Sequence, residues 1–121
     1  ILQNIQQNSK KRHFCIFDEL FSGTNPYEAI GSAHAYLDFI SKFKGVKFML
    51  TTHFIRLCDL FRDTKRVKNM HMSASIQAEI PTYHYKLATG ISTIKGGITV
   101  LRELGYPRTI LEGTREVIGK L

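Results

Sequence analysis

The feature that most constrains this chain is a short apolar run that ends in two adjacent carboxylates. Residues 13–17 lead directly into Asp18 and Glu19, and a loop that contains Gly23 follows them. A continuous apolar run of this length predicts a parallel strand that is covered on both faces. The two acids therefore fall at the carboxyl end of a buried strand, where the ligands of open α/β sheets bind.

A helix is predicted directly after that loop. Asn25 can cap it, Pro26 suits the first helical position, and Glu28 can reach back to the backbone N–H of the cap. Apolar residues recur along it at three- and four-residue steps: Ile30, Ala33, Leu37 and Ile40. This spacing gives the helix one face that can pack on a sheet. We expect the helix to end at Gly45 and a second strand to cover residues 46–52.

Strand, helix and strand in this order form a βαβ unit, in which the two strands are parallel and the crossover is right-handed. His53 directly follows the second strand. Because the carboxyl ends of parallel strands share one edge of a sheet, we expect His53 to lie beside Asp18 and Glu19. A histidine at this edge can hydrogen-bond a phosphate group, whereas a lone histidine is more often a capping or packing residue.

The rest of the chain is predicted to form short elements. Residues 1–9 have the spacing of a helix without an N-cap, which we interpret as the end of a longer helix, and residues 55–61 form another helix. Residues 67–87 are expected to form an antiparallel strand pair. The last segment, 96–121, is predicted to form two short helices separated by residues 105–107. A chain of 121 residues is one domain at most.

The composition is that of an ordinary globular chain, with 43% hydrophobic and 22% charged residues. The apolar runs are too short to cross a membrane, and the first residues lack the regions of a signal peptide. Cys15 and Cys58 are far apart in the sequence, and we interpret them as reduced core residues. We therefore expect an intracellular, soluble protein with no membrane partner, in the cytoplasm, the nucleus or a viral factory.

The net charge of +7 points toward an anionic partner. Basic residues gather at 10–12 and at 62–68, and such clusters can attract phosphate backbones or membrane surfaces. No aromatic residues interleave with them, as they would on a platform that stacks bases. Solvated loops are the alternative interpretation of both clusters.

The acidic pair suits nucleotide hydrolysis. Asp18 can hold magnesium directly or through water, and Glu19 can orient and deprotonate the water that attacks a γ-phosphate. Adjacent strand residues point to opposite faces, so the two acids take different tasks. The alternative is that the pair simply ends a strand at the surface. The apolar residues before the pair and the glycine-threonine turn after it favour the chemical interpretation.

Several motifs together resemble one known family. They are Phe17-Asp18-Glu19-Leu20, Gly23-Thr24, Tyr27, Thr51-Thr52-His53-Phe54, Tyr85-Lys86-Leu87, Gly90-Ile91-Ser92, Gly97-Ile98 and Leu104-Gly105-Tyr106-Pro107. Their order and spacing resemble those of the MutS-type DNA mismatch-repair ATPases, members of the ABC ATPase superfamily. The resemblance implies an α/β fold, as part of an ABC-type P-loop NTPase domain. That part would contain parallel strands, an antiparallel strand pair and a C-terminal helix-turn-helix.

The resemblance also implies a division of the chain. Residues 1–95 match the C-terminal half of the family's ATPase domain, with its Walker B segment, a D-loop-like segment and its histidine switch. Residues 96–121 match the helix-turn-helix that serves dimerisation in the family. DNA, mismatched or branched, would bind through domains outside this chain, and the ATPase domains would pair as a homodimer or a heterodimer.

Individual roles follow from the same resemblance. Asp18 would hold Mg²⁺ through water, Glu19 would activate the attacking water, and His53 would sense the γ-phosphate. The loop that would meet the nucleotide of the second subunit consists of Gly23, Thr24 and Asn25. The implied cofactors are ATP and magnesium.

Two segments depart from the usual pattern of the family. Residues 21–29 are FSGTNPYEA where the family usually has GRGTSTYDG, and residues 95–98 are KGGI where it usually has SYGI. The chain is therefore more similar to divergent MutS-related proteins, including those of large DNA viruses, than to bacterial MutS. These departures bear on mismatch recognition more than on ATP hydrolysis.

The sequence contains no phosphate-binding loop of the form GxxxxGK[ST]. The nearest segment, Gly113 to Lys120, has the wrong spacing and falls in a predicted helix. We therefore expect the isolated chain to bind ATP weakly and to be inactive, with hydrolysis belonging to the full-length protein. Two alternatives are a degenerate, non-catalytic dimerisation module and an ABC ATPase of another branch, such as a chromosome-maintenance or transporter subunit.

Overall fold

The computed structural model describes residues 1–78, 80–94 and 96–121 and divides into two compact units. The first unit comprises residues 1–69 with 89–91, and the second unit comprises residues 70–88 with 92–121. The functional division predicted from the sequence ends at Lys95, which lies outside the described residues. That division stays a prediction.

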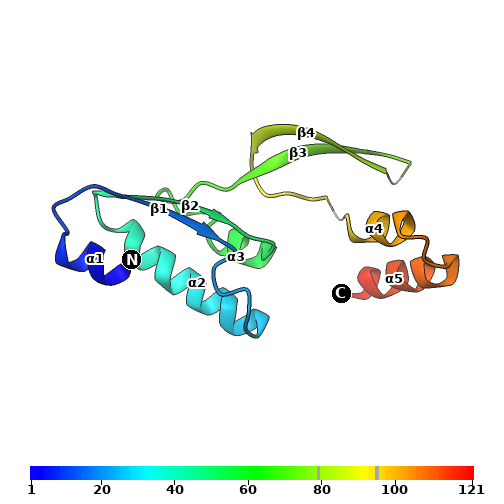
Figure 1. Ribbon diagram of the computed structural model, residues 1–121, viewed down its shortest axis with the longest axis horizontal. Coiled ribbons are helices and arrows are strands. Elements are labelled where there is room, and N and C mark those ends of the chain that lie inside the picture. The colour runs from blue at the N-terminus through cyan, green and yellow to red at the C-terminus, as the bar shows by residue number, and fades with distance from the viewer. Residues whose placement is uncertain (79, 95) are drawn as a thin grey trace. The chain divides into compact units, whose positions relative to one another are not determined.

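The first unit contains the predicted βαβ arrangement (Figure 1). Its elements in chain order are α1 (Leu2–Gln7), β1 (His13–Asp18), α2 (Pro26–Ser41), β2 (Val46–Thr51) and α3 (Ile55–Leu60). β1 and β2 pair in parallel, in a register that runs from His13 opposite Val46 to Asp18 opposite Thr51. The prediction of two parallel strands joined through a helix is confirmed.

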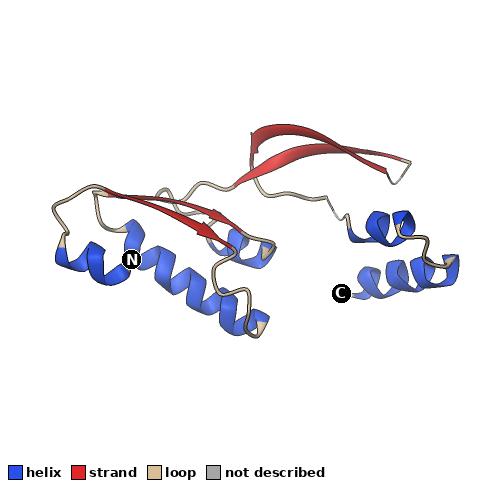
Figure 2. Cartoon of the chain, in the orientation of Figure 1, coloured by secondary structure: helices blue, strands red, loops and turns tan. Residues whose placement is uncertain are grey.

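The core of this unit lies on one face of the parallel pair. In Figure 2, α2 runs along one side of the two strands. Its predicted apolar face is buried there together with inward residues of both strands and of α1 and α3: Ile5, Cys15, Phe17, Ala33, Leu37, Ile40, Val46, Leu57 and Phe61. The 3.6-residue spacing of α2 and the alternation of the strands thus meet in a single apolar layer.

The opposite face of the parallel pair is open in this unit. Its apolar side chains are Phe14, Ile16 and Met49, which are 62%, 70% and 58% exposed. The prediction that residues 13–18 are covered on both faces is therefore wrong for this unit. An apolar run reports which side chains can be buried, whereas burial on both faces requires a second layer.

The start of α2 follows the predicted cap. The Asn25 side chain accepts a hydrogen bond from the backbone N–H of Tyr27 at 2.9 Å. Glu28 differs from the prediction, because its carboxylate accepts a hydrogen bond from the Thr24 hydroxyl at 3.4 Å and not from the backbone N–H of the cap. The side chains around the first turn therefore satisfy local polar groups, as the sequence indicated for Asn25.

The end of α2 differs from the prediction. The helix ends at Ser41, four residues before Gly45. Gly45 instead lies against the chain that enters β1, where a Cβ atom at this position would be 2.5 Å from the Lys11 carbonyl oxygen. Its own carbonyl accepts a hydrogen bond from the His13 N–H at 2.7 Å. Close backbone approach, rather than helix termination, explains this glycine.

The second unit contains a hairpin and two helices. β3 (Met70–Gln77) and β4 (Ile80–Thr89) form a separate two-stranded sheet. Only two residues separate these strands, which is possible only for antiparallel neighbours. α4 (Gly97–Glu103) and α5 (Arg108–Lys120) follow, and Gly105 between them has a φ of 79°. The predicted hairpin and the two predicted C-terminal helices are confirmed.

Candidate functional site

The carboxyl ends of β1 and β2 bring the predicted site residues together. Asp18 and Thr51 are the last residues of their strands and lie opposite each other in the register. The Thr51 hydroxyl donates a hydrogen bond to Oδ1 of Asp18. The Asp18 side chain is exposed at the edge of the sheet, so its carboxylate is accessible to a ligand.

Glu19 leaves the strand through an unusual backbone conformation. Its N–H still donates to the Thr51 carbonyl at 2.9 Å, and its own carbonyl accepts from the Ser22 N–H at 3.1 Å. Its φ of 52° lies in the left-handed region, which residues other than glycine seldom adopt. Such a conformation costs about 1–3 kcal/mol and occurs most often at functional sites. The turn therefore holds the carboxylate of Glu19 out of the regular strand alternation.

His53 contacts Glu19 across the two strands. Its Nε2 atom lies 2.9 Å from Oε1 of Glu19, and the two side chains are 90% and 44% exposed. The sequence placed these residues at one edge of the sheet, and the structure brings them into direct contact. The Thr52 hydroxyl accepts a hydrogen bond from the Phe54 N–H at 3.0 Å and so fixes the turn that carries His53.

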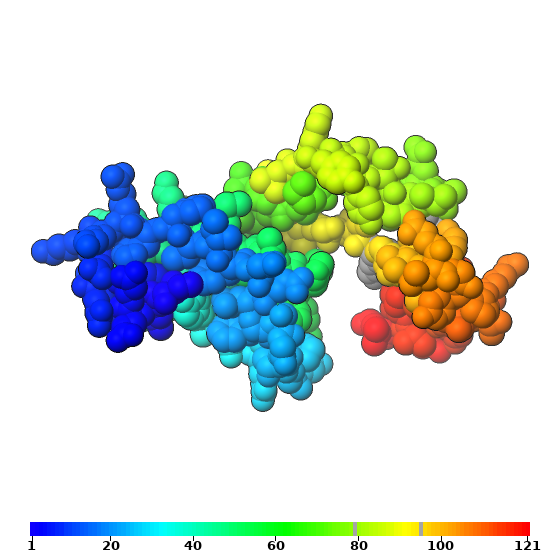
Figure 3. Space-filling view, in the orientation of Figure 1, coloured from blue at the N-terminus to red at the C-terminus, as the bar shows by residue number. Residues whose placement is uncertain are grey.

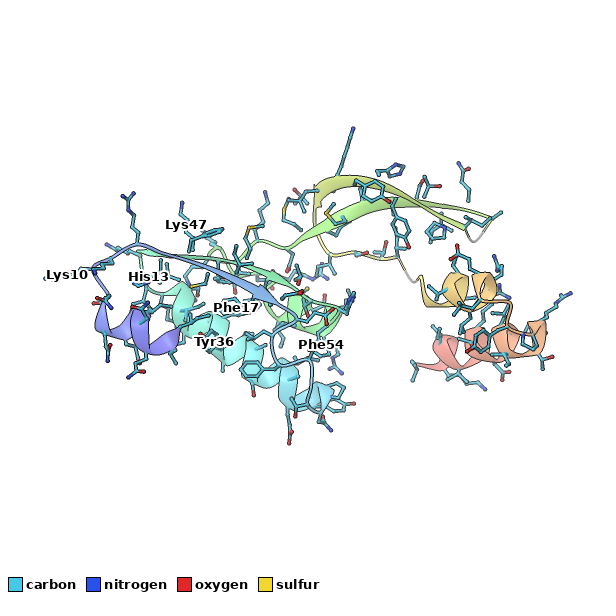
Figure 4. All side chains as sticks on the ribbon, viewed as in Figure 1. Lys10, His13, Phe17, Tyr36, Lys47 and Phe54 are labelled. Carbon is cyan, nitrogen blue, oxygen red and sulfur yellow. The ribbon has the colours of Figure 1, made fainter. Side chains whose placement is uncertain are left out.

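Aromatic side chains support the acidic pair from the core side. The ring of Tyr36 on α2 contacts Phe17 edge-to-face at a centroid distance of 5.7 Å and Phe21 at 6.5 Å. Phe17 and Tyr36 are labelled in Figure 4. Burial raises the pKa of Tyr36 above its ordinary value of 10.0, with a smaller contribution from Cys15. Tyr36 is therefore neutral at pH 7. Its ring contacts one aromatic residue before the acidic pair in the sequence, Phe17, and one after it, Phe21.

The predicted nucleotide-contacting loop lies between this turn and α2. Its three residues, Gly23, Thr24 and Asn25, are all exposed. No atom lies within 4 Å of where a Cβ atom on Gly23 would be. The side chains of Thr24 and Asn25 make the local hydrogen bonds at the start of α2 described above. Contact of this loop with a nucleotide stays a prediction.

The site fits a magnesium ion that is held mainly by water and phosphate. Within the described ranges, no group of three or more His, Cys, Asp or Glu residues could hold a metal ion. Mg²⁺ in nucleotide sites typically uses one or two carboxylates, with waters and phosphates as its other ligands. Asp18, exposed and beside Glu19, offers such a carboxylate.

A hollow of the first unit lies away from this edge. It has a volume of about 310 Å³ and lies between α2 and α3, where it is lined by Tyr27, Ile30, Arg56, Asp59 and Leu60. It contains none of the acidic or histidine residues of the strand edge. We therefore assign the candidate chemistry to the open strand edge and not to this hollow, because the ionisable groups converge at the edge.

The two basic clusters differ in their surroundings. In the second cluster, Arg62 pairs with Asp59, and Arg66 pairs with Asp38 at 3.0 Å. The side chains of residues 10–12 are exposed and make no ion pair within the described part of the chain. Figure 3 shows blue side chains of the N-terminal part that project from the surface, and Lys10 is labelled in Figure 4. The two arginines of the second cluster thus have acidic partners close by, and residues 10–12 have none within the described part of the chain.

Comparison with known proteins identifies the family. The family model described as MutS domain V matches residues 1–121. The chain belongs to the MutS domain V family. Similar proteins named DNA mismatch repair protein MutS come from Aquifex pyrophilus (32% identical over 120 residues, 99% of this chain), Syntrophobacter fumaroxidans (32% over 121 residues, 98%) and Methanosarcina barkeri (30% over 122 residues, 99%). The chain spans 14% of the length of each of these relatives.

The MutS assignment decides between the family interpretations that the sequence offered. The resemblance to MutS-type proteins is confirmed, and the alternative of another ABC branch is set aside. In the described parts of this MutS domain V chain, no helix is long and apolar enough to cross a membrane. Sequence reasoning missed the contacts of Thr51 and Thr52. The contact of Thr51 depends on the register of the two strands, which no local signal in the sequence specifies.

Proposed function

We propose that this chain supplies the hydrolytic edge of an ATP site in a MutS-family DNA mismatch-repair protein. The observation that carries the proposal is the 2.9 Å contact between Glu19 and His53 at the carboxyl edge of two parallel strands. A carboxylate and an imidazole held together in this way can share the work of orienting a water molecule and a phosphate oxygen. The proposed reaction is ATP hydrolysis by the full-length protein.

Each residue of the edge has a separate task in this proposal. Glu19 accepts a hydrogen bond from the attacking water and takes its proton as the water oxygen bonds to the γ-phosphorus and the bond from that phosphorus to the bridging oxygen of the leaving ADP breaks. His53 donates a hydrogen bond to the γ-phosphate, and its ring, which contacts Glu19 through Nε2, is exposed enough to reach a ligand. Asp18 holds Mg²⁺ through water. When bound, the metal ion neutralises charge on the phosphate oxygens.

The proposed partners are a second ATPase domain and DNA. The loop Gly23–Asn25 faces the nucleotide of the second subunit, and α4 and α5 form the dimerisation segment. What supports the second assignment is a set of exposed apolar side chains on and between these helices: Val100, Leu104, Tyr106, Ile110 and Val117. DNA binds through other parts of the protein, and the ATP cycle changes how the dimer holds it. The protein acts inside the cell, where its DNA substrate is.

The test of the proposed reaction is Glu19→Gln in the full-length protein. Glutamine has the same shape as glutamate and should keep the same backbone conformation, but its amide cannot accept the proton. We expect ATP turnover to fall about 100-fold or more, with ATP binding retained. Asp63→Asn, at an exposed carboxylate that follows α3 in the first unit, is the matched control and should leave turnover unchanged.

Two measurements separate this proposal from the alternative of a non-catalytic dimerisation module. ATP turnover is followed by phosphate release, and nucleotide binding is followed by calorimetry with magnesium. Unchanged turnover in Glu19→Gln contradicts the assignment of the base. Absence of turnover in the wild-type protein, together with retained dimerisation, favours the degenerate module.

A further inference from the structure

We propose that Thr51 is a positioning residue for the metal-binding carboxylate, and that it orients Asp18 for magnesium through its side-chain hydroxyl. This inference rests on the proposed function, because it assigns a residue to the same site. Thr51 touches both acids of the site. Its hydroxyl donates to Oδ1 of Asp18, and its carbonyl accepts from the N–H of Glu19 at 2.9 Å.

The register of the strands makes this contact specific. Asp18 and Thr51 lie opposite each other in the parallel pair, so their side chains leave the sheet on the same face. Threonine is branched at Cβ, which restricts its χ1 rotation and therefore the direction of its hydroxyl. The hydroxyl thus reaches the carboxylate from a fixed position on the neighbouring strand.

The chemistry of the contact suits a metal ligand. Oδ1 is held by the hydroxyl, while Oδ2 makes no hydrogen bond or ion pair within the described residues. A lysine or arginine in the place of Thr51 would neutralise the carboxylate, whereas a hydroxyl orients it and leaves its negative charge available. Hydrogen bonds to ligating carboxylates fix their orientation and strengthen metal binding.

A purely structural role makes a different prediction. A hydrogen bond that only ties two strand ends together would affect unfolding and would act equally on every ligand of the site. A positioning role acts on the metal-dependent part of nucleotide binding alone. Comparing nucleotide affinity with and without magnesium therefore separates the two roles.

The experiment uses Thr51→Val, Thr51→Ser and the control Thr82→Val in the full-length protein. Valine keeps the shape of threonine without the hydroxyl, and serine keeps the hydroxyl. Thr82 is an exposed threonine of β4 in the second unit. A fluorescent ATP analogue is titrated in the presence of Mg²⁺ and in the presence of EDTA, and the melting temperature of each variant is recorded.

We expect Thr51→Val to weaken binding in Mg²⁺ about tenfold, the lower end of the effect of partners of metal ligands, because this site is exposed. Binding in EDTA should stay at the wild-type level. Thr51→Ser should restore most of the magnesium effect, and Thr82→Val should behave as wild type. An unchanged magnesium effect in Thr51→Val overturns the inference, and so does an equal loss in Mg²⁺ and in EDTA.

The outcome is distinguishable from failure of the proposed function. If the wild-type protein binds the nucleotide equally well in Mg²⁺ and in EDTA, both the metal role of Asp18 and the role of Thr51 are overturned. A protein that passes that test, but in which Glu19→Gln turns over normally, loses the proposed base and keeps the inference on Thr51. A further outcome is that Thr51→Val lowers the melting temperature, with full recovery in Thr51→Ser, while neither variant changes the difference in nucleotide affinity between Mg²⁺ and EDTA. That result would leave Thr51 a structural role only and contradict the inference.

Discussion

The first and second units of this chain differ in how many of their apolar side chains are buried. In the first unit Ile5, Leu37, Ile40 and Leu57 are completely buried in one cluster. In the second unit only Thr99 and Leu111 are buried among the described residues. The comparison indicates that the unit with the candidate site has its own core, whereas the helices of the second unit gain little from burial within this chain.

The difference matters for the site because Glu19 and His53 are exposed. Their positions depend on the strands and on the aromatic contacts below them, and these belong to the buried cluster of the first unit. A core that is rigid on one side can hold exposed polar groups in a fixed arrangement. The following changes test this contrast, from the largest expected effect to the smallest.

Truncation of buried side chains should give the largest difference in lost stability between the two units. Leu37→Ala removes a fully buried side chain of α2 and should cost about 2–5 kcal/mol of local stability. In the isolated chain Leu111→Ala on α5 should cost clearly less, and Leu104→Ala, at a side chain that is 68% exposed there, should stay within about 0.5 kcal/mol of wild type. Hydrogen-exchange mass spectrometry measures the opening of α2 and α5 separately. Equal losses for Leu37→Ala and Leu111→Ala would contradict the comparison.

A methyl group at Gly45 should strain the first unit. Its Cβ would be 2.5 Å from a backbone oxygen of Lys11, which cannot move without shifting the entry to β1. We expect a loss of about 1–3 kcal/mol in the urea unfolding of this unit. Gly31→Ala is the matched control, since a Cβ atom there would have no atom within 4 Å apart from its chain neighbours and the backbone of its own helix. It should stabilise the helix by roughly 0.5–1 kcal/mol, and the opposite order of the two variants would refute the close-approach explanation.

Loss of the helix cap should have an intermediate effect. Asn25→Ala removes the acceptor for the Tyr27 N–H and should cost about 1 kcal/mol, whereas Asn25→Ser should retain most of the cap. α5 begins after Pro107 without a side-chain cap, so Pro107→Ala should change the exchange rates of its first turn less. Exchange protection at the first turns of α2 and α5 provides the measurement. A cap effect confined to α5 would be the contrary result.

Acid should produce the smallest effect, through Asp38. Its pKa is lowered from the ordinary value of 3.8, first by the hydrogen bond from Lys42 and then by the charge of Lys42 and by Arg66. Because the folded pKa is the lower one, the stabilisation is present above about pH 4 and disappears as the pH falls through the folded value. Asp38→Asn should therefore melt slightly lower than wild type at pH 7, and the difference should disappear as the pH falls through the folded pKa of Asp38. The difference should shrink in high salt, and a difference that grows on acidification would be inconsistent with this sign.

Much of the fold follows from local patterns in the sequence. The spacing of Ile30, Ala33, Leu37 and Ile40 predicts the buried face of α2, and the strand-end rule places His53 beside the acidic pair. The end of α2 could not be predicted in this way, because the reason for Gly45 is the approach of Lys11 from another segment. Local patterns report helix and strand preferences, and contacts between distant segments lie outside them.

The polar contacts of the site show the same limit. Thr51 reaches Asp18 only because of the register of two strands that are separated by a helix. A shift of one residue would move the hydroxyl to the other face of the sheet, and the sequence does not specify that register. The left-handed backbone of Glu19 likewise depends on hydrogen bonds to Thr51 and Ser22, and no residue preference of glutamate predicts it.

The open face of the parallel pair has a practical consequence for anyone who handles residues 1–121 by themselves. Each strand of a two-stranded sheet has a free edge, and here Phe14, Ile16 and Met49 form an apolar surface between those edges. Free edges beside apolar surface favour pairing between molecules. The isolated segment should therefore show concentration-dependent light scattering and precipitation at moderate salt, and a charged replacement at Phe14, at the far end of the strand from the acidic pair, should raise its solubility limit.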